Sequence, residues 1–165
     1  MTVNSKIFSS LQDINPSAII ELFTLQLSTA LHGANTIYRF HAGSNLDANG
    51  KIVWATNEYL RFPIQASGFA FQKGQLPRPK LTMSNLGGIT RLGSVIRVTD
   101  LLLSVNLITA RNDLLKAQLK RITTTADNLD ASNFSGGTNP YGTPSSDENP
   151  QEIYEIDRKV TESRA

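Results

Sequence analysis

Apolar and polar residues alternate along most of the chain, and this pattern predicts a β-rich fold. Extended runs are predicted in the first half at residues 18–27, 36–42, 51–56, 59–62, 67–72 and 80–84. A short helix is predicted at residues 5–14, where Ile7, Phe8, Leu11 and Ile14 share one helical stripe. Such a stripe most simply covers the open end of a sheet, and docking to a partner is the less favoured alternative.

Turn-forming residues separate these runs. Residues 32–35 (HGAN) are predicted to turn the chain. Asn49-Gly50 is the strongest hairpin signal, because both residues accept the positive φ of a type I′ turn. Asn57-Glu58 is predicted to make a tight connection to the next strand. Pro77 and Pro79 remove two backbone donors, so their stretch belongs at a sheet edge or just before a strand.

The pattern changes in the second half. Residues 89–101 follow a helical period, weakened by Gly93, so a further helix is predicted near residues 88–98. Residues 101–110 are apolar and are predicted as a strand, and residues 114–124 fit either a helix or a strand. A final strand is predicted within residues 152–161.

Residues 132–150 are rich in Ser, Gly, Asn and Pro and are predicted to form a long loop. The loop has too few apolar groups to offset its ordering entropy, so neighbouring subunits are expected to pin it. The chain then divides into a helical arm (1–16), a β-rich domain (17–131), the loop (132–150) and a C-terminal strand of the same domain (151–165). The predicted fold class is mainly β, a barrel or sandwich with a short N-terminal helix and one further helix.

Charge is distributed unevenly. Residues 1–72 are neutral overall, residues 73–121 carry nine basic groups against two acidic groups, and residues 122–165 carry eight acidic groups against three basic groups. A basic surface that meets an acidic surface explains these blocks more simply than nucleic-acid binding does. Nucleic-acid sites interleave aromatic side chains with the charges, and residues 73–121 contain none.

The sequence offers little material for catalysis. There is no cysteine, and two histidines are too few for a histidine-only zinc site. No phosphate-binding glycine loop and no GxSxG motif occurs. His41 is expected to be a packed or edge histidine, and the acidic residues 147–157 lack the calcium-loop pattern. No enzymatic activity, no metal and no cofactor are therefore predicted.

The ends and the hydropathy suggest a cytoplasmic product. No apolar run approaches the roughly 20 residues of a membrane-spanning helix. Residues 1–10 do not combine a charged start with an apolar stretch, so they do not form a signal peptide.

Several segments carry a family resemblance, including residues 19–27, residues 53–59 and residues 152–164. Residues 62–69 (FPIQASGF), followed by Gly74 and residues 78–86 (RPKLTMSNL), resemble the central signature of the minor tail protein L family of lambda-like phages. Residues 128–134 (NLDASNF), followed by Gly136 and Asn139, are similar to the family's Asp-Ala-x-Asn-Phe segment. The similarity runs in order along nearly the whole chain.

The resemblance implies a structural role at the tail tip and a fold similar to the β-barrels of tail tubes and hubs. It implies a homo-oligomeric ring, expected as a trimer, assembled in the host cytoplasm. The implied partners are the distal tail protein ring and the central host-specificity protein, with the tape measure protein as a further candidate. Family members continue into a cysteine-bearing domain similar to iron–sulfur sites, and this sequence has no cysteine for such a site.

A ring places different surfaces of neighbouring copies in contact, and the two charge blocks supply two such surfaces. The competing interpretation is that the blocks pair within one subunit. The rival function is a small β-rich module that binds nucleic acid or carbohydrate. The candidate interface residues are Leu76, Pro77, Arg78, Pro79, Arg91, Arg97, Arg111, Lys116, Lys120, Arg121, Asp147, Glu148, Glu152 and Glu155.

Overall fold

The computed structural model describes residues 5–13, 17–43, 50–70, 74–84, 89–91, 94–97, 100, 114–148 and 152–160. Strands account for most of its regular structure, which confirms the mainly β prediction. In chain order the elements are α1 (Ser5–Gln12), β1 (Ile19–Gln26), α2 (Thr29–His32), β2 (Ile37–His41), β3 (Lys51–Trp54), β4 (Asn57–Arg61), β5 (Ile64–Ser67), β6 (Lys80–Met83), β7 (Ile89–Arg91), β8 (Ser94–Ile96), β9 (Gln118–Thr125), η1 (Ala126–Asn128), η2 (Ala131–Asn133) and β10 (Glu152–Glu155).

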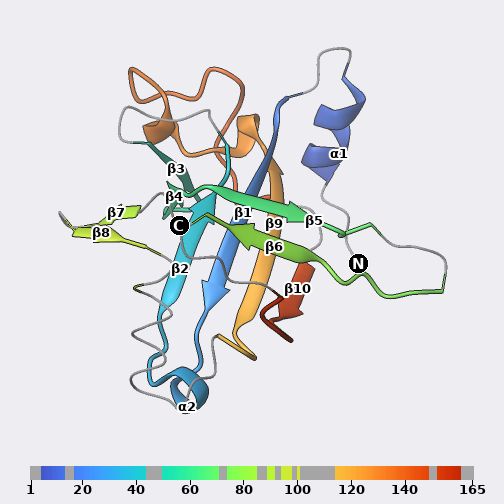
Figure 1. Ribbon diagram of the computed structural model, residues 1–165. Coiled ribbons are helices and arrows are strands. Elements are labelled where there is room, and N and C mark those ends of the chain that lie inside the picture. The colour runs from blue at the N-terminus through green and yellow to red at the C-terminus, as the bar shows by residue number, and fades with distance from the viewer. Residues whose placement is uncertain are drawn as a thin grey trace.

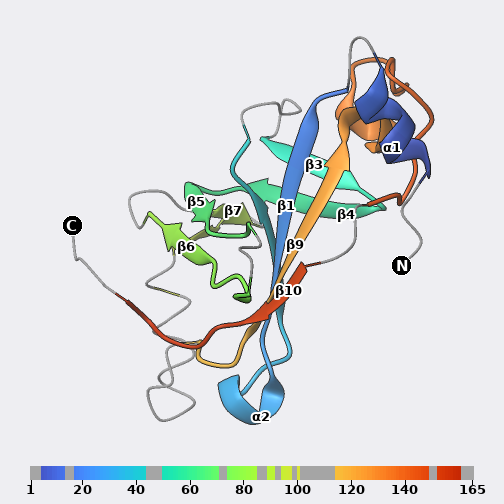
Figure 2. The ribbon, with the colours of Figure 1, turned by 90° about the vertical axis from the view of Figure 1, so that its right-hand side faces the viewer.

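One six-stranded sheet organises the molecule, with the strand order β10-β9-β1-β2-β4-β3. Its neighbours are antiparallel except for β2 and β4, which run parallel. The sheet twists strongly and curls into a half-barrel (Figures 1 and 2). β5 and β6 form a separate antiparallel pair, and so do β7 and β8.

Each face of the sheet carries its own hydrophobic cluster, because successive side chains of a strand point to opposite faces. Phe23 and Leu25 of β1 belong to one cluster, which the β5–β6 pair covers with Ile64 and Leu81. Leu22 of the same strand belongs to the other cluster. That second cluster also contains Ile52, Trp54, Tyr59, Ile122 and Leu129.

The early strands expected at residues 18–27, 36–42, 51–56, 59–62 and 80–84 are present, but their pairing differs from the expected hairpin. The extended run predicted at residues 67–72 is wrong for residues 68–70, because β5 spans Ile64–Ser67 and the positive φ of 83° at Gly68 ends the extended backbone. Gly50 has the positive φ of 73° that its turn signal implies, while Asn49 lies outside the described residues. β2 and β3 do not pair, because β4 lies between them and bonds to both. The backbone N–H of Phe62 donates to the carbonyl of His41 at 2.9 Å and extends the parallel contact. A local turn signal therefore did not determine the pairing of the strands.

The tight connection between β3 and β4 lies two residues earlier than predicted. Ala55 and Thr56 form the turn, with φ angles of 49° and 63°, the left-handed conformation of a type I′ hairpin. Asn57 and Glu58, the predicted turn residues, instead pair with Trp54 and Val53.

The predicted helix near residues 88–98 is wrong, because β7 and β8 form an antiparallel hairpin there. Ile89, Thr90, Val95 and Ile96 are β-branched, and such side chains favour extended backbone over helix. The segment 114–124, which fitted either a helix or a strand, contains most of β9. β9 pairs with β1 over more residues than β2 does. The predicted strand at residues 101–110 lies outside the described residues.

The N-terminal helix α1 is confirmed and lies beside one end of β1 and β9 (Figure 2). Ile7 is buried, whereas Leu11 is 42% exposed. The predicted apolar stripe therefore contacts its own domain through Ile7.

Candidate assembly interface

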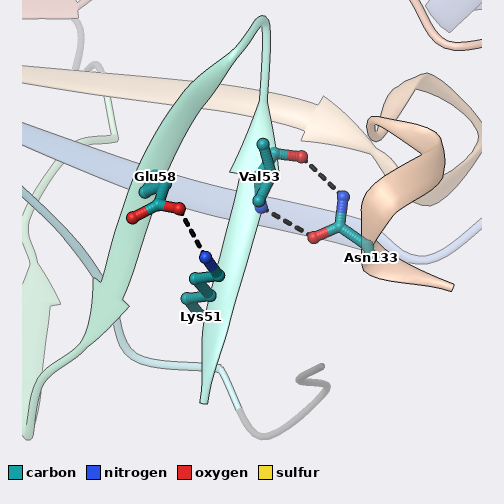
Figure 3. A network of polar contacts seen from close by, with 4 residues as sticks. All are labelled: Lys51, Val53, Glu58 and Asn133. Carbon is teal, nitrogen blue, oxygen red and sulfur yellow. Dashed lines mark hydrogen bonds and ion pairs between the residues drawn. The ribbon is translucent and has the colours of Figure 1, made fainter. Parts of the chain in front are cut away.

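The edge strand β3 is capped by side chains from a distant part of the chain (Figure 3). The side-chain oxygen Oδ1 of Asn133 accepts the backbone N–H of Val53 at 2.6 Å, and its Nδ2 donates to the Val53 carbonyl at 2.6 Å. One amide thus makes the two hydrogen bonds that a neighbouring strand residue would make. The backbone N–H of Asp130 also donates to the Val53 carbonyl, at 3.2 Å. This edge of the sheet is occupied by the chain itself.

Asp130 also stabilises the left-handed turn between β3 and β4. Its carboxylate accepts the backbone N–H of Ala55 at 3.1 Å through Oδ1 and that of Thr56 at 2.8 Å through Oδ2. Non-glycine residues pay a steric cost in this conformation. The two charge-assisted hydrogen bonds offset that cost, so the turn forms without Gly.

Asparagine side chains hold much of the loop that follows. Nδ2 of the buried Asn139 lies 2.9–3.2 Å from the carbonyls of Ala126, Asp127 and Leu129. The loop therefore finds polar partners within its own chain. The expectation that neighbouring subunits pin the loop was based on its few apolar groups and stays a prediction.

Further along the loop, Asn128 and Thr124 bind it to the sheet. The carbonyl of Asn128 accepts the backbone N–H of Ser145 at 3.1 Å. The hydroxyl of Thr124 in β9 donates to the carbonyl of Asp147 at 2.8 Å. These contacts place the acidic end of the loop beside β9.

The basic and acidic blocks meet within one subunit at β9 and β10. Arg121 donates to Glu152 at 2.7 Å and also pairs with Glu21 of β1. Its guanidinium lies 4.3 Å from the centre of the Phe69 ring, which in turn packs edge-on against Tyr154. Burial would lower the pKa of Arg121, yet its two carboxylate partners raise it.

Two further pairs link the same blocks. Lys120 lies 3.8 Å from Glu148, and Lys116 lies 3.4 Å from Glu155. The side chains of the second pair are each 62% exposed, so this contact contributes little to stability. These contacts agree with the competing interpretation, in which the basic and acidic blocks pair within one subunit.

The other candidate interface residues lie elsewhere. Leu76 is 84% exposed, and Arg78 is also exposed, between the half-buried Pro77 and Pro79. This exposed segment directly precedes β6, as the prolines predicted. Arg91 ends β7, Arg97 follows β8, Asp147 accepts from Thr124 as described, and Arg111 lies outside the described residues.

An open hollow of about 480 Å³ lies beside α2. Its described lining is mostly polar and includes Gln26, Ser28, Asn35 and Gln118. No aromatic residue is among that described lining, so a sugar ring would have no flat surface on which to stack.

Both histidines are buried and structural. His32 accepts the backbone N–H of Ser28 through Nδ1 at 3.0 Å, so its Nε2 carries the proton that is donated to the Leu115 carbonyl at 3.0 Å. His41 is fully buried, as its prediction as a packed histidine implies, and burial lowers its pKa to about 4. Within the described ranges, no three His, Asp or Glu side chains form a group that could hold a metal ion.

An iron–sulfur cluster does not fit these residues. Such clusters are held by cysteine thiolates, and the chain has no cysteine. None of the helices in the described part of the chain is long and apolar enough to cross a membrane.

The sequence prediction missed Asp130 and Asn133, the residues that finish the β3 edge. A signal was present, since both belong to the Asp-Ala-x-Asn-Phe segment. A comparison with family models matches the model described as phage minor tail protein L over residues 29–165.

Proposed function

The chain belongs to the phage minor tail protein L family, and on that premise we propose that it forms part of the hub at the tail tip. It is a structural protein of the bacteriophage tail. In the proposed position it joins the distal end of the tail tube to the central host-recognition protein. The observation that carries this proposal is the family match, which covers residues 29–165.

The proposed neighbours are further copies of the chain in a ring, the distal tail protein ring, the central host-specificity protein and the tape measure protein. Assembly in this proposal takes place in the host cytoplasm. The structure supports an assembly role through its two different sheet edges, because one edge is capped by the chain and the other carries exposed charge.

We propose no catalytic role and no cofactor for this chain. Catalysis by a serine triad would need an accessible histidine base, whereas His32 and His41 are both buried. The rival nucleic-acid function is weakened because Lys116, Lys120 and Arg121 are paired with carboxylates of the same chain. Retention of the purified chain on DNA at physiological salt would favour that rival.

Labelling of intact phage tests the position. Gold-labelled antibody fragments raised against the purified chain are applied to virions, and the label is expected at the distal end of the tail tube. Antibody fragments preincubated with the purified chain serve as the control for specificity, and virions of a phage that lacks the gene, complemented in trans, serve as the positive control. Label along the tube, on the head or absent from complemented virions would contradict the proposal.

A further inference from the structure

The two edges of the six-stranded sheet are finished differently. At the β3 edge, Asn133 takes the place of a neighbouring strand. At the other edge, β10 pairs with β9 on one side, and no described strand pairs with its outer side. Strand edges with unpaired backbone groups are templates for pairing with another chain. β10 is therefore the edge available for assembly.

The backbone groups of β10 that point outwards follow from the register. Ile156 bonds inwards, since its N–H donates to the Ala117 carbonyl at 2.9 Å and its carbonyl accepts the Lys116 N–H at 2.8 Å. Inward and outward residues alternate along an antiparallel strand. The N–H and C=O groups of Ile153 and Glu155 therefore point to the outer side, and both side chains are exposed.

Residues 152–157 of the β10 edge carry three carboxylates, and Arg158 and Lys159 follow directly. Glu152 pairs with Arg121 of the same chain, and Glu155 pairs with Lys116 in an exposed contact. Glu155 and Asp157 are exposed, and Glu152 stands at the start of the same strand. A second β10 placed antiparallel against this edge would bring carboxylates of the two copies together, and like charges directly opposite each other are destabilising. A symmetric register that places Glu155 opposite itself is thus disfavoured, and a strand with a basic residue at this position avoids the repulsion.

The β7–β8 hairpin has the matching properties. Its strands pair only with each other among the described strands. Arg91 ends β7, and Arg97 directly follows β8 with an exposed side chain, while the Asp100 carboxylate accepts the backbone N–H of Arg97 at 3.0 Å. The hairpin and β10 lie on opposite sides of the molecule (Figure 1). A hairpin on one side and an open edge on the other can connect copies head to tail.

We propose that β8 of one copy adds to the outer edge of β10 in the next copy. Main-chain hydrogen bonds to Ile153 and Glu155 supply the contact, and Arg97 pairs with Glu155. Such a contact joins two different surfaces, so it closes a ring or extends a filament according to its rotation. This inference deepens the proposed function and rests on it for the ring.

Cysteine cross-linking tests the contact directly, because the chain has no cysteine of its own. Full-length Arg97→Cys and Glu155→Cys chains are mixed under mild oxidation over a series of concentrations. A disulfide-linked pair of the two variants is expected to form at least tenfold faster than the pair of Arg97→Cys with Tyr141→Cys. Tyr141 is a matched control, since it is 67% exposed and lies on the loop, where its ring packs against Phe134.

A backbone variant separates the strand contact from a chance encounter. Ile153→Pro removes an outward N–H and leaves the inward bonds to β9, and proline is tolerated on edge strands. It is expected to abolish the cross-link while the unfolding transition stays cooperative. Arg97→Glu is expected to weaken self-association, and Glu155→Arg in the partner copy to restore it.

The possible results are distinct. Rates equal to the Tyr141→Cys control, or a preference of Glu155→Cys for itself, overturn the hairpin contact, and the second result would indicate a symmetric β10 pair. A monomeric chain at every concentration also overturns it. If gold label marks the tail tip but the cross-link fails, this inference fails alone. If the cross-link forms but the label is absent from virions, the proposed function fails.

Discussion

Replacing Asn133 with alanine is expected to destabilise the protein by about 2–3 kcal/mol. The side chain makes two hydrogen bonds of 2.6 Å to Val53 and a third of 2.7 Å from Nδ2 to the Asp130 carbonyl. Each such bond contributes about 1 kcal/mol net, or about 3 kcal/mol for the three. Val53 is half-buried, so water replaces part of this contribution in the variant.

Equilibrium unfolding in urea measures the change, and Ser132→Ala is the matched control. Ser132 lies next to Asn133 in the same short helix and is exposed, so its substitution is expected to change stability by less than about 0.5 kcal/mol. The Asn133→Ala variant is also expected to self-associate more readily, because the edge of β3 becomes free to pair. An Asn133→Ala loss no larger than that of the control would refute the interpretation of this amide as a strand cap.

Asn133→Asp separates the donor from the acceptor at the same site. The carboxylate still accepts the Val53 N–H, but a second acceptor then faces the carbonyls of Val53 and Asp130. At neutral pH the loss is expected to equal or exceed that of Asn133→Ala. The neutral carboxyl is favoured in the folded state, which raises its pKa, so the variant regains stability as the pH falls. A pH-independent difference from the parent protein would count against this explanation.

Three further predictions concern other parts of the sheet. Thr56→Gly is expected to stabilise the protein by about 1 kcal/mol in urea unfolding, because glycine adopts the turn's positive φ without steric cost; a loss would mean that the threonine side chain matters more than the strain. Arg121→Met is expected to cost about 1–3 kcal/mol, since it leaves two carboxylates without their partner, whereas Lys116→Met at an exposed pair should cost less than about 0.5 kcal/mol; equal losses would contradict this ranking. Burial makes His41 bind a proton more weakly in the folded state than in the unfolded state. Its contribution of about 3 kcal/mol to the free energy of unfolding is therefore present above the unfolded pKa of about 6.5 and is lost as the pH falls towards 4. His41→Leu should flatten the pH profile of stability in that window, and an unchanged profile would exclude this histidine as its source.

The sequence predicted elements better than it predicted their partners. The period-2 pattern located β1, β2 and β6, and the two prolines correctly indicated the start of a strand. The pattern failed at residues 88–98, where apolar spacing suited a helix but β-branched side chains favoured the hairpin of β7 and β8. The hydrophobic spacing there favoured a helix and the intrinsic preference of the residues favoured a strand, and the structure has strands.

Strand pairing depends on contacts between residues far apart in sequence, and the chain's local patterns carry little information about it. The left-handed turn at Ala55 and Thr56 is an example, because neither residue favours that conformation alone. Asp130, more than 70 residues later, supplies the hydrogen bonds that stabilise it. The charge blocks were visible in the sequence, but only the register of β9 against β10 shows which groups meet within one copy.

The pairing of β1 with β9 also bears on when the protein can fold during its synthesis. Ile19 pairs with Thr125 and Gln26 with Gln118, so two neighbouring interior strands of the sheet lie far apart in the sequence. When β1 to β4 have emerged from the ribosome, β1 still lacks the strand that pairs with its other side. That side of β1 can form its backbone hydrogen bonds only after β9 has emerged. Long-range antiparallel pairing of this kind is slow because loop closure precedes the contacts that reward it. The nascent chain therefore completes its sheet late, and truncation before β9 would leave β1 exposed to pairing with other unfinished chains.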